Sequence, residues 1–181
     1  MNIREAMPLL ARHEGVWDGT YTYFNAANEK IDEHASRLLC RITDGGDHPY
    51  HQTNHYRWAD GRYEIRDFPA TYRDGRIWWD NELIQGWAAE VPLDDYNRTM
   101  MLYWQRTGDA SLYLYEQIQI SDDGQNRCRT WHWIRDGMLE TRTAIQERFV
   151  TRDWRGMDEE MKAAEVAGRR VVFGHGSGFG G

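Results

Sequence analysis

The sequence predicts a mainly β protein: a single up-and-down antiparallel β-barrel of about eight to ten strands, with a short N-terminal helix and a short C-terminal helix. Two observations support this fold class. Short segments rich in aromatic and β-branched residues recur along most of the chain, and sequences such as Asp60-Gly61, Asp123-Gly124 and Asp136-Gly137 separate them. Asp-Gly pairs favour tight hairpin turns. No long helical segment lies between the strands, which leaves little room for parallel βαβ units.

The N-terminal residues predict one amphipathic helix followed by the first strand. Residues 2–13 carry apolar side chains at helical spacing, and Gly15 is a typical residue for the end of a helix. Trp17 then begins an aromatic segment that extends to Phe24. We therefore expect a helix over residues 2–13 and a first strand over residues 17–24.

Ten strand candidates follow one another without a fixed-period repeat. They are residues 17–24, 31–42, 50–58, 62–67, 76–80, 82–91, 98–106, 112–121, 127–134 and 138–150. Beyond Thr151, residues 157–167 are rich in Ala, Glu and Met and predict a terminal helix. We expect a barrel domain over residues 1–155, and a helix with a glycine-rich tail over residues 156–181. In that tail, His175-Gly176-Ser177-Gly178 lacks the strand and helix context of a nucleophile or phosphate loop.

Composition restricts the classes of function. The 181-residue chain has a net charge of −7, which argues against binding to nucleic acid or to anionic membranes. It contains nine Trp, ten Tyr and five Phe, and such rings suit the wall of a cavity for an amphipathic ligand. No segment has the length of a membrane span or the pattern of a signal peptide. Two cysteines, Cys40 and Cys128, fit a reducing compartment, so we expect a cytoplasmic protein.

The segment Gly15-Val16-Trp17, placed after a short helix, resembles the start of the calycins. This superfamily includes the lipocalins, the fatty-acid-binding proteins and the phycobiliprotein lyases, whose first strand commonly carries Gly-x-Trp. The resemblance implies a closed barrel in which Trp17 plugs one end and contacts the N-terminal helix. Only the plug positions match, so the resemblance transfers no ligand-binding residue to this chain.

The turn positions allow neighbours to be placed across the last hairpins. A two-residue turn at Asp136-Gly137 pairs Trp131 with Arg142, and the preceding loop places Glu116 opposite Trp131. One face of the last four strands is then aliphatic, Trp-rich and partly charged, and we expect it to face the interior. Its members are Met100, Leu102, Trp104, Leu112, Leu114, Glu116, Ile118, Arg129, Trp131, Trp133, Glu140, Arg142 and Ala144.

The same counting applies to the hairpin around Asp60-Gly61. A two-residue turn there pairs Trp58 with Tyr63 and Tyr56 with Ile65. The expected interior residues are Asn54, Tyr56, Trp58, Tyr63 and Ile65, and the expected exterior residues are His55, Arg57, Glu64 and Arg66.

Three ionised residues would then face an aromatic cavity, where unpaired charges are costly. In one interpretation Arg129 and Arg142 anchor a carboxylate or phenolate, and Glu116 is a general base with a raised pKa. The alternative is a structural Arg–Glu network across adjacent strands. If the faces are inverted, His132 is the acid–base candidate and Tyr115 lies beside it. The candidate ligand-binding residues are Arg129, Trp131, Trp133, Trp104, Asn54, Tyr56, Trp58 and Tyr115.

Metal and cofactor sites are not expected. His51 and His55 are separated by about 13 Å along an extended strand, which is too far for a shared ion, and His48 falls in a turn. The chain carries no Walker loop, dinucleotide fingerprint or serine elbow.

Two classes of function remain open at this stage. In the first, the barrel is a cofactor-independent lyase, isomerase or cyclase for an amphipathic, aromatic anion, and Glu116, Arg142 and His132 are its catalytic candidates. In the second, it is a carrier or chaperone for a lipophilic ligand or chromophore. The number of titratable groups favours the enzyme. Exposed Trp and Tyr side chains also allow a homodimer interface.

Overall fold

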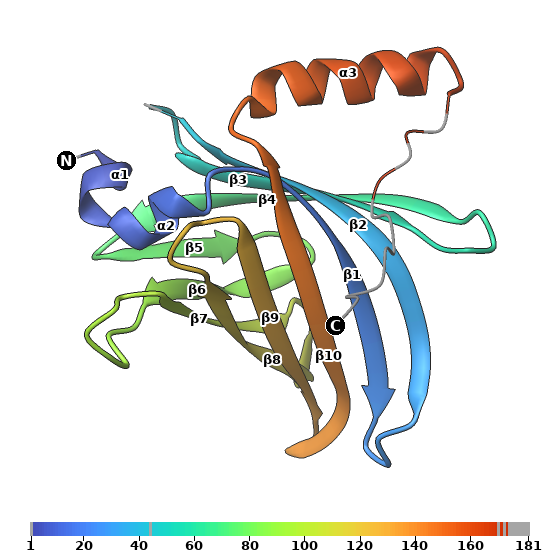
Figure 1. The fold of residues 1–181 in the computed structure, drawn as a ribbon. Coiled ribbons are helices and arrows are strands. Elements are labelled where there is room, and N and C mark those ends of the chain that lie inside the picture. The colour runs from blue at the N-terminus through green and yellow to red at the C-terminus, as the bar shows by residue number, and fades with distance from the viewer. Residues whose placement is uncertain (1, 44, 170, 172, 174–181) are drawn as a thin grey trace.

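Ten antiparallel strands form one closed barrel in the computed structural model, which describes residues 2–43, 45–169, 171 and 173 (Figure 1). The strands are β1 (Gly15–Asn25), β2 (Lys30–Ile42), β3 (Tyr50–Arg57), β4 (Tyr63–Arg73), β5 (Arg76–Asp80), β6 (Ile84–Glu90), β7 (Thr99–Arg106), β8 (Asp109–Ile120), β9 (Asn126–Arg135) and β10 (Met138–Thr151). Each strand pairs with the next along the chain, and β1 pairs with β10 to close the sheet. The predicted up-and-down β-barrel is therefore confirmed.

The N-terminal segment forms two short helices, where the sequence predicted one. They are α1 (Ile3–Ala6) and α2 (Pro8–Arg12). Pro8 disfavours a helical conformation at the preceding residue, and Met7 accordingly has φ −133° and ψ 73°. The helix therefore breaks at Met7 and resumes in a new direction.

Trp17 lies fully buried beneath these helices at 0% exposure. Its indole nitrogen donates to the backbone oxygen of His13 at 2.9 Å, and its ring packs edge-to-face with that of Phe149 at a centroid distance of 5.2 Å. Gly15 allows the chain to enter the barrel here, because it has a φ of +130° and a Cβ would lie 2.7 Å from the backbone oxygen of Thr151. The predicted contact between Trp17 and the N-terminal helical segment is thus present.

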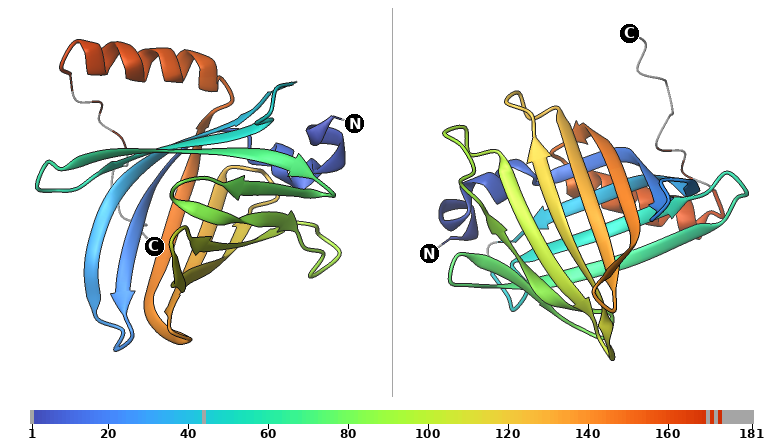
Figure 2. Two further views of the ribbon diagram at one scale, coloured as in Figure 1. Left: turned by 180° about the vertical axis from the view of Figure 1, so that it is seen from behind. Right: turned by 90° about the horizontal axis from the view of Figure 1, so that it is seen from below.

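Helix α3 (Trp154–Val166) lies on the outside of the barrel, against β1 and β2 (Figures 1 and 2). It begins three residues earlier than predicted, because the Asp153 carboxylate accepts a hydrogen bond from the backbone nitrogen of Gly156 at 3.0 Å. Residues 174–181, with His175-Gly176-Ser177-Gly178, lie outside the described residues. In the described part of the chain, no helix combines the length and apolar character needed to cross a bilayer.

The β9–β10 hairpin contains a bulge that reverses the predicted faces of β10. Glu140 is the extra residue, so Trp131 lies opposite Thr143, whereas the two-residue turn predicted Arg142. A shift of one residue moves every side chain to the other face of a strand. Glu140, Arg142 and Ala144 therefore lie outside, and the prediction that Arg142 faces the interior is wrong. Glu147 lies inside, where it is 3% exposed.

The β3–β4 hairpin also differs from prediction by one residue. Its loop covers residues 58–62 and is longer than the two-residue turn, so Tyr56 lies opposite Glu64. Glu64 and Arg66 consequently face the interior, whereas Tyr63 and Ile65 face outward. The predicted faces of these four residues were wrong, and those of Asn54 and Tyr56 were right.

Strands β7 to β9 keep the predicted faces. Glu116 lies opposite Trp131, as expected. Counting from a turn at Gly108-Asp109 predicts that Trp104 lies opposite Leu112. It lies opposite Leu114, and a shift of two residues preserves the face.

Candidate functional site

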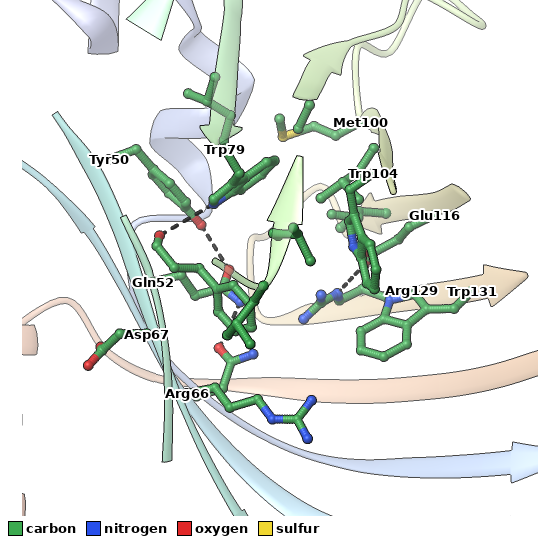
Figure 3. A pocket seen from close by; sticks show the side chains of 18 of the residues that line it. Tyr50, Gln52, Arg66, Asp67, Trp79, Met100, Trp104, Glu116, Arg129 and Trp131 are labelled. Carbon is green, nitrogen blue, oxygen red and sulfur yellow. Dashed lines mark hydrogen bonds and ion pairs between the residues drawn. The ribbon is translucent and has the colours of Figure 1, made fainter. Parts of the chain in front are cut away.

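The barrel encloses a cavity of about 410 Å³ (Figure 3). Its apolar wall includes Leu10, Tyr50, Ile77, Trp79, Met100, Leu102, Trp104, Ile118, Trp131 and Trp133. Glu64 and Arg66 form an ion pair of 2.7 Å at its edge, and both side chains are 42% exposed. The cavity is thus lined mainly by aromatic and aliphatic groups and reaches solvent beside β4.

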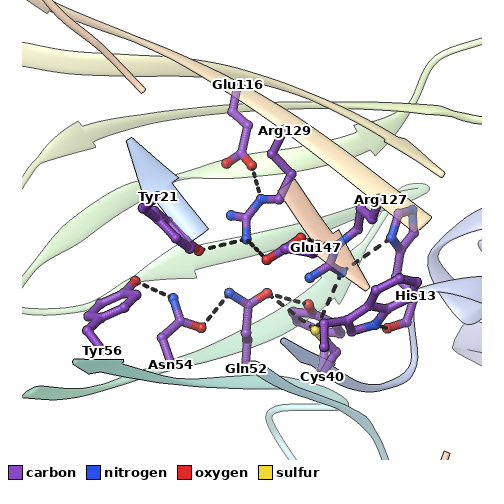
Figure 4. A network of polar contacts seen from close by, with 12 residues as sticks. His13, Tyr21, Cys40, Gln52, Asn54, Tyr56, Glu116, Arg127, Arg129 and Glu147 are labelled. Carbon is purple, nitrogen blue, oxygen red and sulfur yellow. Dashed lines mark hydrogen bonds and ion pairs between the residues drawn. The ribbon is translucent and has the colours of Figure 1, made fainter. Parts of the chain in front are cut away.

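A buried network of alternating charges crosses one wall of the cavity (Figure 4). Arg129 pairs with Glu116 on β8 and, through Nη1, with Oε1 of Glu147 at 3.3 Å. Arg127 pairs through Nε with the other oxygen of Glu147 at 2.5 Å. The four residues are 1–6% exposed. Two carboxylates and two guanidinium groups therefore neutralise each other inside the barrel.

The opposite charges in this network keep its members ionised. Burial acts to raise the pKa of Glu147, but Arg127 and Arg129 outweigh it and lower that pKa below its ordinary value. Burial likewise acts to lower the pKa of Arg129, but Glu116 and its other partners outweigh it and raise that pKa. Both groups therefore stay charged at neutral pH.

Four buried N–H groups that belong to cavity-lining residues lack a hydrogen-bond partner among the described residues. They are Nε2 of His13, Nη2 of Arg127, Nε1 of Trp131 and Nε1 of Trp133. The nitrogen Nη1 of Arg127 lies 3.4 Å from Nδ1 of His13. Arginine can only donate, so Nδ1 accepts and the imidazole proton sits on Nε2. Burial, reinforced by Arg127, lowers the pKa of His13 well below its usual value, which keeps the ring neutral.

A row of polar side chains lies on the inner face of β3 (Figure 4). The Tyr50 hydroxyl lies 2.9 Å from Oε1 of Gln52, and Nε2 of Gln52 lies 2.7 Å from Oδ1 of Asn54. The row ends at Tyr56, whose hydroxyl accepts from Nδ2 of Asn54 at 2.6 Å. On β1, the Tyr21 hydroxyl accepts from Nη1 of Arg129 at 3.0 Å.

Seven of the residues singled out in the sequence line this cavity. They are Asn54, Tyr56, Trp104, Glu116, Arg129, Trp131 and Trp133. Trp58 lies beside it and donates its indole N–H to the Asp32 carboxylate at 3.0 Å. Its ring packs against that of Tyr56 at a centroid distance of 6.3 Å, and Trp58 is not among the residues that line the cavity.

The remaining candidates gather on the outer surface. The ring of His132 lies 5.0 Å from that of Tyr115, and Arg142 lies opposite His132 and bonds Asn28. Partial burial and the charge of Arg142 lower the pKa of His132. The predicted catalytic set of Glu116, Arg142 and His132 is thus divided between the two faces of the sheet.

Two residues that complete the buried network, Arg127 and Glu147, were not predicted from the sequence. Arg127 was predicted only as the first residue of a strand, and its two-residue spacing from Arg129, which puts both on one face, was not used. Glu147 was given no face, and counting on from Arg142 and Ala144 without the bulge at Glu140 would have placed it outside. An interior Glu147 could have been suspected from the charge of Arg127 and Arg129, which one carboxylate cannot balance.

Two of the three histidines considered as metal ligands bond other side chains. His51 lies 3.2 Å from the Asp67 carboxylate, and Nδ1 of His55 lies 2.6 Å from the Tyr63 hydroxyl. Within the described residues, no three His, Cys, Asp or Glu side chains are grouped as a metal site.

Several solved structures have a similar barrel fold. The S-type phycobiliprotein lyase CPES from Guillardia theta has a TM-score of 0.63 at 13% identity, over 83% of this chain and 94% of that one. A DUF3598-family protein from Nostoc punctiforme has a TM-score of 0.59 at 14% identity, over 78% of this chain, which spans about half (49%) of that protein. Rv2717c from M. tuberculosis has a TM-score of 0.55 at 15% identity, over 81% of this chain and 98% of that one.

At these identities the likeness concerns the fold, and it confirms the predicted calycin-like barrel. No protein-family model matches the chain, and no curated protein sequence matches it.

Proposed function

We propose that the barrel binds a small amphipathic molecule whose oxygen atoms accept hydrogen bonds from the cavity wall. The observation that carries this proposal is the set of four buried N–H groups without a partner. An unsatisfied buried donor costs about 1–3 kcal/mol, and a ligand that supplies acceptors would recover that free energy. The rings of Trp104, Trp131 and Trp133 provide the apolar surface for the rest of the molecule.

Binding without chemical conversion is the better supported role. A general acid or base must reach the atom that it protonates or deprotonates, whereas Glu116 is buried in an ion pair with Arg129. The other acid–base candidate, His132, lies on the outer surface. The fold is shared with a phycobiliprotein lyase, but a fold does not determine a function.

A lyase or isomerase that transfers a proton remains the second candidate, and one observation favours it. Glu116 and Arg129 both line the cavity, so an anionic substrate that pairs with Arg129 would release the Glu116 carboxylate to act as a base. In that case Glu116→Gln would retain binding and lose about 10²- to 10⁴-fold in turnover. A carrier would show no turnover to lose.

A thermal-shift series on one ring skeleton tests the binding proposal. We expect 2-naphthoic acid to stabilise the protein, by about 2.7 kcal/mol at a hundredfold excess over its Kd. The naphthylmethylammonium ion should give little shift, because it offers donors to a wall that already presents donors. Equal shifts with the acid and the ammonium ion, or no shift with either, would contradict the proposal.

A matched pair of variants locates the binding site. Trp131→Phe removes an unpartnered indole N–H from the cavity, and the shift with 2-naphthoic acid should decrease. Trp78→Phe makes the same change on the outer face of β5, where the indole already donates to the backbone oxygen of Arg73 at 3.2 Å. The shift with Trp78→Phe should match that of the unaltered protein.

A further inference from the structure

We propose that Tyr56 donates a hydrogen bond to a carbonyl-type oxygen of the bound molecule, because a one-way chain of hydrogen bonds along β3 leaves its hydroxyl proton free (Figure 4). This inference rests on the proposed function and extends it in two ways. It names Tyr56 as the residue that selects the ligand, and a carbonyl-type oxygen as the group that Tyr56 recognises.

The direction of this hydrogen-bond chain is set at its far end by the Arg127 guanidinium, which can only donate. The nitrogen Nη1 of Arg127 lies 3.8 Å from Sγ of Cys40, and that sulfur lies 3.7 Å from Oε1 of Gln52. Since a guanidinium has no acceptor, the Cys40 sulfur accepts from Arg127 and turns its own proton towards Gln52. The Tyr50 hydroxyl reaches the same Gln52 oxygen. Two donors on that oxygen identify it as the amide carbonyl.

The remaining links follow from this orientation. With its oxygen occupied, Gln52 presents its amide nitrogen to the Asn54 oxygen at 2.7 Å. Asn54 then presents its own nitrogen to the Tyr56 hydroxyl at 2.6 Å. An amide nitrogen only donates, so the Tyr56 oxygen accepts and its O–H proton points elsewhere. Tyr21 also hydrogen-bonds Tyr56 and lowers its pKa, as a donor to the Tyr56 oxygen does. The Tyr21 oxygen itself accepts from Arg129, so the proton between the two hydroxyls is that of Tyr21.

The surroundings of Tyr56 suit an electron-rich oxygen. Tyr56 lines the cavity and is 4% exposed. Burial raises the pKa of its phenol above the ordinary value, against the opposing effects of Asn54 and Arg129, so the group is a neutral donor at physiological pH. The Arg66 guanidinium lies 5.7 Å from the centre of the Tyr56 ring. A ketone, carboxylate or enolate oxygen beside this hydroxyl would meet a donor and two nearby cations.

Two naphthalene probes separate this hydrogen bond from general binding. The first is 6-propionyl-2-(dimethylamino)naphthalene, whose emission moves to longer wavelength when its ketone oxygen accepts a hydrogen bond. The second is 2-(dimethylamino)naphthalene, which has the same ring and amine but no ketone. Fluorescence titration of the full chain gives a Kd for each probe, and the emission maximum of the first reports the hydrogen bond.

Two variants act on the chain at different points. Tyr56→Phe removes the hydroxyl, and Asn54→Asp replaces a donor with a carboxylate that captures the Tyr56 proton. For both, we expect the Kd of the ketone probe to rise by about five- to tenfold and its emission to move to shorter wavelength. The Kd of 2-(dimethylamino)naphthalene should not change. The control Tyr113→Phe alters a tyrosine on the outer face of β8 and should leave both probes unaffected.

The outcomes distinguish the inference from the function on which it rests. If Tyr56→Phe binds 2-(dimethylamino)naphthalene normally, and binds the ketone with unchanged Kd and emission, the role of Tyr56 is refuted while the binding function stands. If neither probe binds the unaltered protein, the proposed function fails and this inference fails with it. Asn54→Asp provides the same comparison should Tyr56→Phe not fold.

Discussion

Glu147 holds two buried arginines in place, and the substitution Glu147→Gln tests how much of the fold depends on it. The carboxylate is shared between Nε of Arg127 and Nη1 of Arg129, and its side chain is fully buried. Glutamine keeps the shape but removes the negative charge. Arg127 would then lack its only ion-pair partner among the described residues, since Glu116 is already paired with Arg129.

The expected loss is large because the uncompensated charge is buried. Removing one partner of a buried ion pair costs about 3–5 kcal/mol of unfolding free energy. At about 2–4 °C per kcal/mol for a chain of this size, the melting temperature should fall by roughly 10 °C. The control is Glu140→Gln on the same strand, whose carboxylate bonds Arg135 at 2.8 Å with both side chains more than 40% exposed. That exposed pair is worth about 0–1 kcal/mol.

Urea unfolding followed by tryptophan fluorescence measures both variants. If the slope with denaturant is unchanged, the shift in midpoint gives the loss of stability directly. A loss below about 1 kcal/mol for Glu147→Gln, or equal losses for the two variants, would show that the buried network does not hold the barrel wall together.

Three further predictions concern the plug, the sheet and the response to acid. Trp17→Ala should cost about 3–5 kcal/mol in urea unfolding, because it empties a fully buried site; a loss below about 1 kcal/mol would argue against the plug. Gly86→Ala should lower stability and the yield of folded protein, since a Cβ there would lie 2.1 Å from the Tyr103 backbone oxygen; an alanine variant as stable as the original would refute this close approach. Burial lowers the pKa of His55 to about 4, so the folded state binds fewer protons than the unfolded state between pH 6.5 and 4. Stability should fall by about 1–3 kcal/mol as pH drops through that window, and His55→Gln should lose less over the same range; an equal loss would assign the effect to other groups.

The strands were predictable because their signals are local. Asp136-Gly137 and Asp123-Gly124 indicate the ends of hairpins whatever the rest of the fold. Counting residues from these turns gave the inner and outer faces of β8 and β9. The break between α1 and α2 was also visible in the sequence at Pro8, although the helical spacing of the apolar residues concealed it.

The faces of β10 and β4 were not predictable from turns alone. The bulge at Glu140 and the loop at residues 58–62 each shift the register by one residue, and the Asp-Gly pairs in these two hairpins do not indicate the shift. Half of the buried network was therefore anticipated, as the Glu116–Arg129 pair, and half was missed. Catalytic roles were predicted for His132 and Arg142 because the turns did not reveal that both side chains lie on the outer face of the sheet.

Closure of the barrel by β1 and β10 sets the order in which the protein can fold. These strands pair Tyr21 with Ile145 and Trp17 with Phe149, residues more than a hundred positions apart. Bringing them together costs chain entropy before the contacts between them add any stability. During synthesis, Arg127 and Arg129 emerge before Glu147, and their charges meet that carboxylate only when β10 is inserted. We expect amide protection in pulsed hydrogen exchange to appear last along the β1–β10 seam, and simultaneous protection across the sheet would exclude this order. Strand β1, the first to be synthesised, would then complete its pairing only after β10, the last, is in place.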